Sequence, residues 1–106
     1  MTHVTLTRSN GRYTVEAEGH AATVGTDGSV SGHRYVCVAV SVMLQMLHTW
    51  LVWSKADVSE AEIESGKSRL RFSGKGCDTA FQMAYCGFRR LAETNPEDIQ
   101  YEVHYH

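Results

Sequence analysis

The longest apolar stretch of the chain runs from Gly32 to Trp53, and it limits the folds that this sequence can adopt. Its length and its apolar content predict a helix that begins near Arg34 and buries much of its surface. Gln45 and His48 interrupt the apolar run, and about 18 positions are the lower limit for crossing a bilayer. We therefore expect the core helix of a folded domain and no insertion into a membrane.

Polar residues within this predicted helix follow a regular spacing. These polar residues are Cys37, Ser41, Gln45 and His48. Successive members are four, four and three positions apart, so all of them lie on one face of the helix. Either this face borders a polar cleft, or each side chain is satisfied by local hydrogen bonds to the backbone. Met43, Trp50 and Trp53 make the rest of the helix more apolar than one sheet contact requires. This excess indicates a second buried face, which is a candidate subunit interface.

A hairpin is predicted on each side of this helix. Residues 3–21 alternate apolar and polar side chains around Ser9–Gly11, a turn sequence that tolerates positive φ. Residues 56–74 repeat the pattern around a turn at 65–67. The segment between the first hairpin and the helix, residues 22–32, is rich in glycine and has no periodicity, so we expect a mobile loop there.

The C-terminal part of the chain predicts a second helix and a last strand. From Asp78, a candidate N-cap, apolar residues recur at spacings of three and four until Asn95 and Pro96 end the pattern. Residues 98–106 alternate again and are typical of a strand. The predicted order is ββαββαβ. This order favours an α+β two-layer sandwich, in which a mostly antiparallel sheet carries both helices on one face.

Composition and charge exclude several classes of protein. With 106 residues, 42% hydrophobic and 21% charged, the chain fits one soluble globular domain, residues 1–106. A formal charge of -2 gives no general attraction to nucleic acid or anionic lipid, so we expect neither as a partner. The N-terminal segment lacks a basic region followed by an apolar run, so we expect no secretory signal. The cysteines include no Cys-x-x-Cys pair, which favours a reducing cytoplasm.

Cys37 has the sequence position of a nucleophile. It falls in the first turn of the predicted helix, where unpaired N–H groups and the helix dipole favour an anion and therefore the thiolate. A neighbouring imidazole is needed to complete activation. The candidates are His20, at the end of the second strand, and His33, four residues before the cysteine. Cys77 and Cys86 have no paired base in the sequence, so we expect them to be packing residues.

Two motifs connect these residues to a known family. The motif Gly-His-Ala ends the second predicted strand at 19–21, and Val-Cys-Val-Ala-Val-Ser opens the helix at 36–41. Together with the chain length and the order of elements, they resemble the ribosomal-processing cysteine protease family, Prp, over essentially the whole chain. The resemblance implies a cytoplasmic homodimer with a Cys–His dyad and no cofactor. It also implies the reaction, in which a short N-terminal extension is removed from a large-subunit ribosomal protein, or a related viral structural protein is processed.

The resemblance further implies roles for single residues. Cys37 would be the nucleophile of a cysteine endopeptidase and His20 its base. Ser41 would line the same site, Gly19 would let the backbone approach closely, and the loop 22–32 would move to admit an extended peptide.

One position departs from the family pattern. The family usually has an acidic residue three positions before the nucleophile, whereas this chain has Arg34. An arginine assists thiolate formation but does not reproduce the hydrogen bonds of an acid at a helix start. We group Arg34 and His33 with Gly19 and Ser41 as candidate substrate-binding residues.

Two other functions fit the same residues. The first is a peptide-binding or assembly module of this fold without turnover, which Arg34 and the wide apolar surface of the helix suggest. The second is a zinc site built from His20, His33, Cys37 and His48, although their spacing matches no closed structural zinc motif. We expect the peptidase, with no metal.

Overall fold

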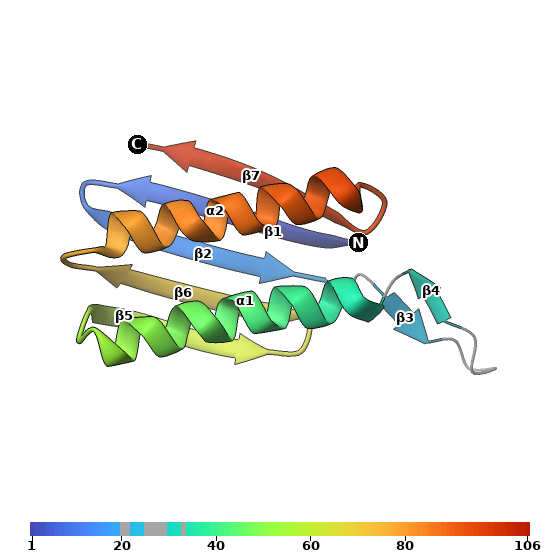
Figure 1. The fold of residues 1–106 in the computed structure, drawn as a ribbon, viewed down its shortest axis with the longest axis horizontal. Helices are drawn as coiled ribbons and strands as arrows, with labels where there is room; N and C mark the ends of the chain where they lie inside the picture. The colour runs from blue at the N-terminus through green and yellow to red at the C-terminus, as the bar shows by residue number, and fades with distance from the viewer. Residues whose placement is uncertain (20–21, 25–29, 33) are drawn as a thin grey trace.

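The computed structural model describes residues 1–19, 22–24, 30–32 and 34–106, and it has the predicted α+β architecture (Figure 1). The elements in chain order are β1 (Thr2–Ser9), β2 (Arg12–Glu18), β3 (Ala22–Val24), β4 (Val30–Gly32), α1 (Arg34–Trp53), β5 (Asp57–Glu64), β6 (Lys67–Ser73), α2 (Cys77–Thr94) and β7 (Ile99–Tyr105). Without the short strands β3 and β4, the order is the predicted ββαββαβ.

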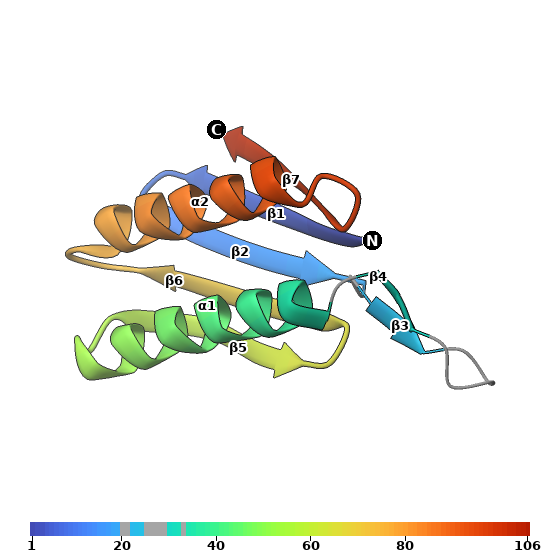
Figure 2. The ribbon, with the colours of Figure 1, turned by 45° about the vertical axis from the view of Figure 1, so that its right-hand side comes forward.

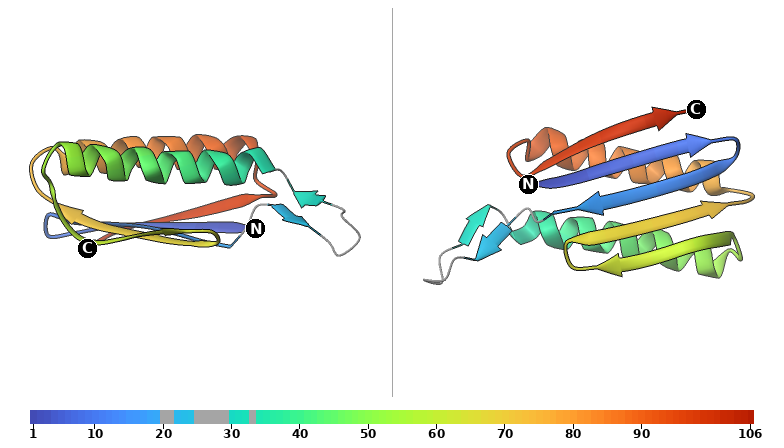
Figure 3. Two further views of the ribbon diagram at one scale, coloured as in Figure 1. Left: turned by 90° about the horizontal axis from the view of Figure 1, so that it is seen from below. Right: turned by 180° about the vertical axis from the view of Figure 1, so that it is seen from behind.

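The main sheet has five strands in the order β5-β6-β2-β1-β7. Neighbouring strands pair antiparallel except β1 and β7, which are parallel, so the prediction of a mostly antiparallel sheet is confirmed. Figure 3 shows both helices on one face of this sheet and the other face uncovered. The helices run antiparallel to each other, and α1 begins at the end of the molecule where α2 and its following loop end (Figures 1 and 2).

The two predicted hairpins form as expected. Asn10 and Gly11 both have positive φ, 52° and 77°, which is the backbone of a two-residue turn that matches the twist of the flanking strands. At the other hairpin Glu64 pairs with Lys67, so the turn consists of Ser65 and Gly66, and Gly66 has φ 80°. Residues of this second turn line the cavity described below.

The prediction of a loop over residues 22–32 is wrong for two of its segments. Strands β3 and β4 pair antiparallel, with Ala22 opposite Gly32, and form a separate two-stranded sheet. Figure 2 shows this ribbon beside the start of α1. Each strand has only three residues, and such short segments carry no periodicity from which pairing could be predicted.

The core lies between the sheet and the inner faces of the helices. The buried apolar residues of the sheet are Val4, Leu6, Tyr13, Val15, Ala17, Leu70, Phe72 and Ile99. Those of the helices are Val36, Val40, Leu44, Leu47, Leu51, Cys77, Phe81 and Phe88. Each large side chain in these sets contributes about 1.5–3 kcal/mol by leaving water.

Helix α1 has a buried face and an exposed apolar face. Its segment Tyr35–Trp53 has the length and hydropathy of a membrane-spanning helix, but its buried residues recur every three or four positions and pack on the sheet. The opposite side exposes large apolar side chains, between 55% and 81% of each being accessible, and they are Tyr35, Val38, Val42, Met46, Val52 and Trp53. The predicted apolar excess is therefore present, and most of it lies on the outside of the molecule.

Helix α2 begins differently from the prediction. It starts at Cys77, its N-cap is Gly76 with φ 83°, and no side chain caps it, so Asp78 is not the N-cap. Asp78 instead pairs with residues of the first hairpin: its carboxylate lies 3.0 Å from Arg8 Nη1 and accepts the hydroxyl hydrogen of Tyr13 at 3.3 Å. An acidic residue in the first turn also suits the helix dipole. The tertiary partners decide the role of this residue.

The uncovered face of the sheet is charged. Arg69 Nε lies 3.0 Å from Glu16 Oε1 and 3.5 Å from Glu60 Oε2, within ion-pair distance although its N–H points at neither oxygen. Residues of this kind are stable beside water without a covering layer.

Candidate active site

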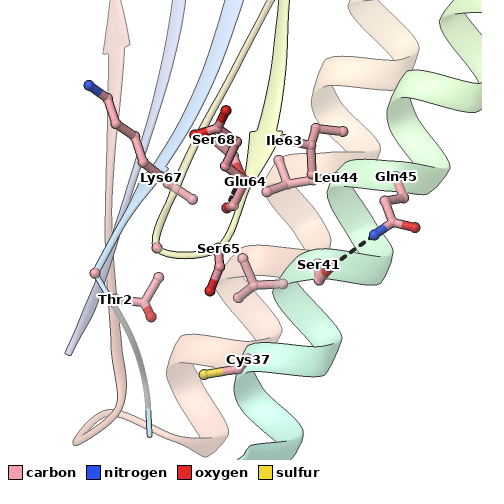
Figure 4. Close-up of a pocket in the computed structure, with 14 residues that line it drawn as sticks. Thr2, Cys37, Ser41, Leu44, Gln45, Ile63, Glu64, Ser65, Lys67 and Ser68 are labelled. Carbon is pink, nitrogen blue, oxygen red and sulfur yellow. Dashed lines mark hydrogen bonds between the residues drawn. The ribbon is translucent and has the colours of Figure 1, made fainter. Parts of the chain in front are cut away.

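A cavity of about 300 Å³ lies where the start of α1 meets the sheet (Figure 4). Four parts of the chain line it: the first residue of β1, the end of β2 with Gly19, the first turns of α1, and residues 63–68 of the β5–β6 hairpin. Its apolar floor consists of Ala17, Val40, Leu44 and Ile63. The volume suits one or two side chains of a bound ligand.

The predicted polar stripe of α1 forms one wall of this cavity. Cys37, Ser41 and Gln45 all line it, and Gln45 Nε2 donates a hydrogen bond to Ser41 Oγ at 3.0 Å. Cys37 is half-buried and in the first turn of the helix, as predicted. His48, the last residue of the stripe, does not line the cavity and lies roughly 16 Å from Cys37 along the helix axis, at 1.5 Å per residue. Cys37, Ser41 and Gln45 therefore border a polar cleft, which is the first of the two interpretations of this helix face.

Gly19 occupies the opposite wall in a conformation that requires glycine. Its φ is +90°, and a Cβ atom there would overlap the carbonyl oxygen of Met1. Its N–H donates to the carbonyl oxygen of Gly66 at 2.9 Å. The backbone that lies against Gly19 is that of Met1, and a substrate-binding role for Gly19 stays a prediction.

The sequence did not identify two other wall residues, Thr2 and Ser65. Thr2 comes from the edge of β1 and Ser65 from the β5–β6 turn, and Figure 4 shows both side chains directed into the cavity near Cys37. Glu64 and Lys67 also line the cavity, but their charged groups point away from Cys37 (Figure 4). The surroundings of Cys37 contributed by these residues are therefore polar and uncharged. In the sequence, the alternation of apolar and polar residues shows only which face of a strand each side chain is on. It does not show which strand lies next to the start of a helix.

The other two cysteines differ from Cys37 and from each other. All three are free thiols. Cys77 is fully buried in the core, as a packing residue should be, and burial raises the pKa of its thiol above the ordinary value. Cys86 is exposed on α2, so its prediction as a packing residue is wrong. Of the three, only Cys37 lines the cavity.

Three predicted site residues have no described side-chain geometry. His20 and His33 lie outside the described residues, and of Arg34 only its place as the first residue of α1 is described. Two of the four proposed zinc ligands are therefore outside the described part of the chain. Within the described ranges, His, Cys, Asp and Glu side chains form no group of three that could hold a metal ion.

The surroundings of Cys37 can support the chemistry of a thiolate. A half-buried thiol at the start of a helix meets an open cavity, and the N–H groups of the first helical turn lack acceptors within the helix. Such N–H groups stabilise negative charge, on the sulfur or on an oxygen that develops charge during the reaction.

Solved structures with the same fold include proteases. The structure of SMU.848 from Streptococcus mutans superposes with a TM-score of 0.73 at 22% identity, covering 100% of this chain and 96% of that chain. Two structures of the essential ribosomal processing protease Prp from S. aureus, one with a covalently linked product peptide and one with a substrate peptide, each give a TM-score of 0.70 at 20% identity. Each covers 97% of this chain and 99% of that chain.

The sequence was also compared with family models and with curated proteins. No curated protein gives a significant match. The model of the family described as cysteine protease Prp matches residues 1–100. This match covers nearly the whole chain, including both motifs and the cavity lining. The chain therefore belongs to the Prp family of cysteine proteases.

Proposed function

We propose that this protein is an endopeptidase that removes a short N-terminal extension from a large-subunit ribosomal protein in the cytoplasm, with Cys37 as nucleophile and His20 as base. The observation that carries the proposal is the position of Cys37, which lines an open cavity from the first turn of α1. The S. aureus relative, a ribosomal processing protease, was solved with substrate and product peptides, which supports an extended peptide as the substrate.

The reaction proceeds in two halves on this geometry. His20 accepts the thiol proton of Cys37, and the sulfur attacks the carbonyl carbon of the scissile amide, whose C=O electron pair moves onto the oxygen. N–H groups of the first turn of α1 stabilise that oxyanion. The C–N bond then breaks as His20 gives its proton to the leaving amine, and a thioester remains. Water, deprotonated by His20, hydrolyses the thioester and restores the free thiol.

Other predicted residues take binding roles in this proposal. Ser41 contributes a hydroxyl one turn after Cys37 on the same wall. Gly19 joins the end of β2 to the β5–β6 turn through its N–H, which donates to the carbonyl oxygen of Gly66. Arg34, the first residue of α1, and His33, which precedes it in the sequence, are further substrate-binding residues in this proposal.

The proposed active form is a homodimer. The exposed apolar side chains of α1 form a continuous outer face, and residues of this kind are depleted on monomer surfaces unless another molecule covers them. In this proposal the covering molecule is a second copy of the chain, since the same apolar face on both copies can pack against itself about a twofold axis.

Candidate substrates test the proposal directly. The protein is incubated with synthetic peptides that carry N-terminal extensions of large-subunit ribosomal proteins, and mass spectrometry locates any cut. We expect a single internal cleavage site, and we expect Cys37→Ala to abolish cleavage without lowering the melting temperature. Cleavage by the Cys37→Ala variant would overturn the assignment of the nucleophile. Peptide binding without any cleavage by the parent protein would favour the non-catalytic binding module instead.

A further inference from the structure

Thr2 presents a buried hydroxyl to the cavity beside Cys37. Only 4% of Thr2 is exposed, and its N–H is used by the carbonyl oxygen of Asp98 at 2.9 Å. Its hydroxyl makes no hydrogen bond to any of the described residues. The oxygen is not sealed inside the protein either, because among the described side chains only Arg69 Nε is both sealed and without a hydrogen bond. The hydroxyl therefore opens into the cavity, as Figure 4 shows.

A hydroxyl in this position needs a partner that enters the cavity. Buried polar groups in folded proteins are almost always hydrogen-bonded, since an unpaired one costs free energy. Solvent supplies the bond when the cavity is open to water. A bound peptide that displaces this solvent has to replace the bond with one of its own groups.

Two further hydroxyls face the same space. Ser65, in the β5–β6 turn, forms no side-chain hydrogen bond with the described part of the chain, and its side chain is directed into the cavity (Figure 4). Ser41 accepts a hydrogen bond from Gln45, so the hydrogen of its own hydroxyl remains free to be donated. Hydroxyls from three elements thus surround one space.

The floor and the charges of the cavity narrow the chemistry of its ligand. Ala17, Val40 and Leu44 are at most 7% exposed and give the floor an apolar surface. The charged groups of Glu64 and Lys67 point away from Cys37. A charged side chain would lose its hydration without a countercharge from any of the described residues near Cys37, and an aliphatic one would leave the Thr2 hydroxyl unpaired.

From these observations we infer that the cavity is a specificity subsite in which Thr2 selects a substrate side chain that is uncharged and hydrogen-bonding, that is Ser, Thr, Asn or Gln. The selected residue is within two positions of the scissile bond, because the subsite shares its wall with Cys37. This inference rests on the proposed peptidase function and adds the class of residue that the site accepts.

The test compares isosteric residues in the substrate and in the protein. A library of proteome-derived peptides is digested with the parent protein, and mass spectrometry identifies a cleaved sequence. Synthetic versions of that peptide carry Thr or Val at each of the two positions on either side of the cut. We expect one position at which the Thr peptide has a kcat/KM about tenfold or more above the Val peptide. Thr2→Val, which keeps the shape of the side chain, should remove this preference.

A variant on the same strand serves as the matched control. Thr5→Val alters the same strand on the uncovered face of the sheet and should keep the preference. No preference at any of the four positions, or a preference that survives in Thr2→Val, would overturn the subsite while leaving the peptidase intact.

The binding readout does not depend on cleavage. Immobilised Cys37→Ala protein is exposed to the same library, and the retained peptides are sequenced. Retained peptides rich in Ser, Thr, Asn or Gln, and lost in the Cys37→Ala/Thr2→Val double variant, support the subsite even if the parent protein cleaves nothing. Retention without such enrichment contradicts it.

Discussion

Gly19 at the end of β2 lies against the carbonyl oxygen of Met1, with no room between them for a side chain. The same glycine donates its N–H to Gly66 in the β5–β6 turn. One residue thus joins three of the chain segments that surround the cavity of Cys37. In the sequence, His20 is the next residue after this contact.

The first prediction follows from this contact. Gly19→Ala should lower the free energy of unfolding by more than Gly11→Ala does. Both glycines have positive φ, +90° and +77°, so both substitutions carry a backbone strain of about 1–2 kcal/mol. Only at Gly19 does the added Cβ also overlap another backbone atom, whereas nothing lies within 4 Å at Gly11. Urea denaturation measures the free energy of unfolding of both variants. Equal decreases would show that the backbone at Met1 moves away from the added Cβ atom without a loss of stability.

The second prediction concerns the reactivity of the three thiols. Cys37 should react with iodoacetamide faster than Cys86 at neutral pH, although Cys86 is the more exposed, because Cys37 is in the first turn of a helix and Cys86 is in the middle of one. Cys77 should react only on unfolding, since it is fully buried and burial raises the pKa of its thiol. Peptide-resolved mass spectrometry gives the three rates. If Cys86 reacts as fast as Cys37, solvent accessibility alone governs the alkylation rate. That result would contradict the claim that the helix start favours the thiolate of Cys37.

The third prediction separates the two candidate bases. His20 directly follows the anchored Gly19, whereas His33 comes just before α1 and next to Gly32 in a glycine-containing segment. A general base must be positioned before its proton affinity matters. We expect His20→Ala to lower kcat/KM on the order of a hundredfold or more, and His33→Ala much less. The pH profile should lose its imidazole-dependent limb only in the His20 variant. A silent His20→Ala and an inactive His33→Ala would transfer the role to His33.

The fourth prediction is a loss of stability at alkaline pH. Burial raises the pKa of Tyr13, helped by the nearby Asp78 carboxylate and its hydrogen bond, and burial raises the pKa of Cys77. The folded state therefore holds both protons more tightly than the unfolded state. This stabilisation is complete below the unfolded pKa values, about 8.5 for cysteine and about 10 for tyrosine. It is lost as the pH rises from these values towards the higher folded ones.

Two variants check the alkaline prediction. Urea denaturation between about pH 7 and 11 should show a falling free energy of unfolding above about pH 8.5. Tyr13→Phe should flatten the part of the decline above about pH 10, and Tyr105→Phe, at an exposed position on β7, is the control. An unchanged slope in Tyr13→Phe would mean that its phenol does not contribute.

The fifth prediction concerns the exposed apolar face of α1. The parent protein should sediment as a dimer at micromolar concentration, and Val42→Glu should make it a monomer by placing a charge in the interface. Thr14→Glu, on the uncovered face of the sheet opposite Arg71, should leave the dimer intact. A monomeric parent protein would contradict the assignment of this face.

Local sequence patterns determined most of the secondary structure. Alternation around Asn10-Gly11 and Ser65-Gly66 predicted both hairpins, because a strand exposes successive side chains to opposite faces and these turns need residues with positive φ. The spacing of Cys37, Ser41, Gln45 and His48 predicted one polar face on α1, since residues three and four apart share a helix face, and the first three line the cavity. These are properties of neighbours in the chain, so sequence alone can report them.

What the sequence left open depends on partners that are distant in the chain. Asp78 has the residue type of an N-cap, yet Arg8 and Tyr13 bind its carboxylate one residue inside the helix. Strand order brings Thr2 and Ser65, 63 positions apart, to the same cavity as Cys37. No local sequence pattern predicts that these residues come together. The strand order is selected by hydrophobic burial, and this burial involves whole faces of the sheet. The sequence alone therefore determined the two helices, the five strands of the main sheet and the nucleophile candidate, and only tertiary packing decided which hydroxyl-bearing residues line the cavity with it.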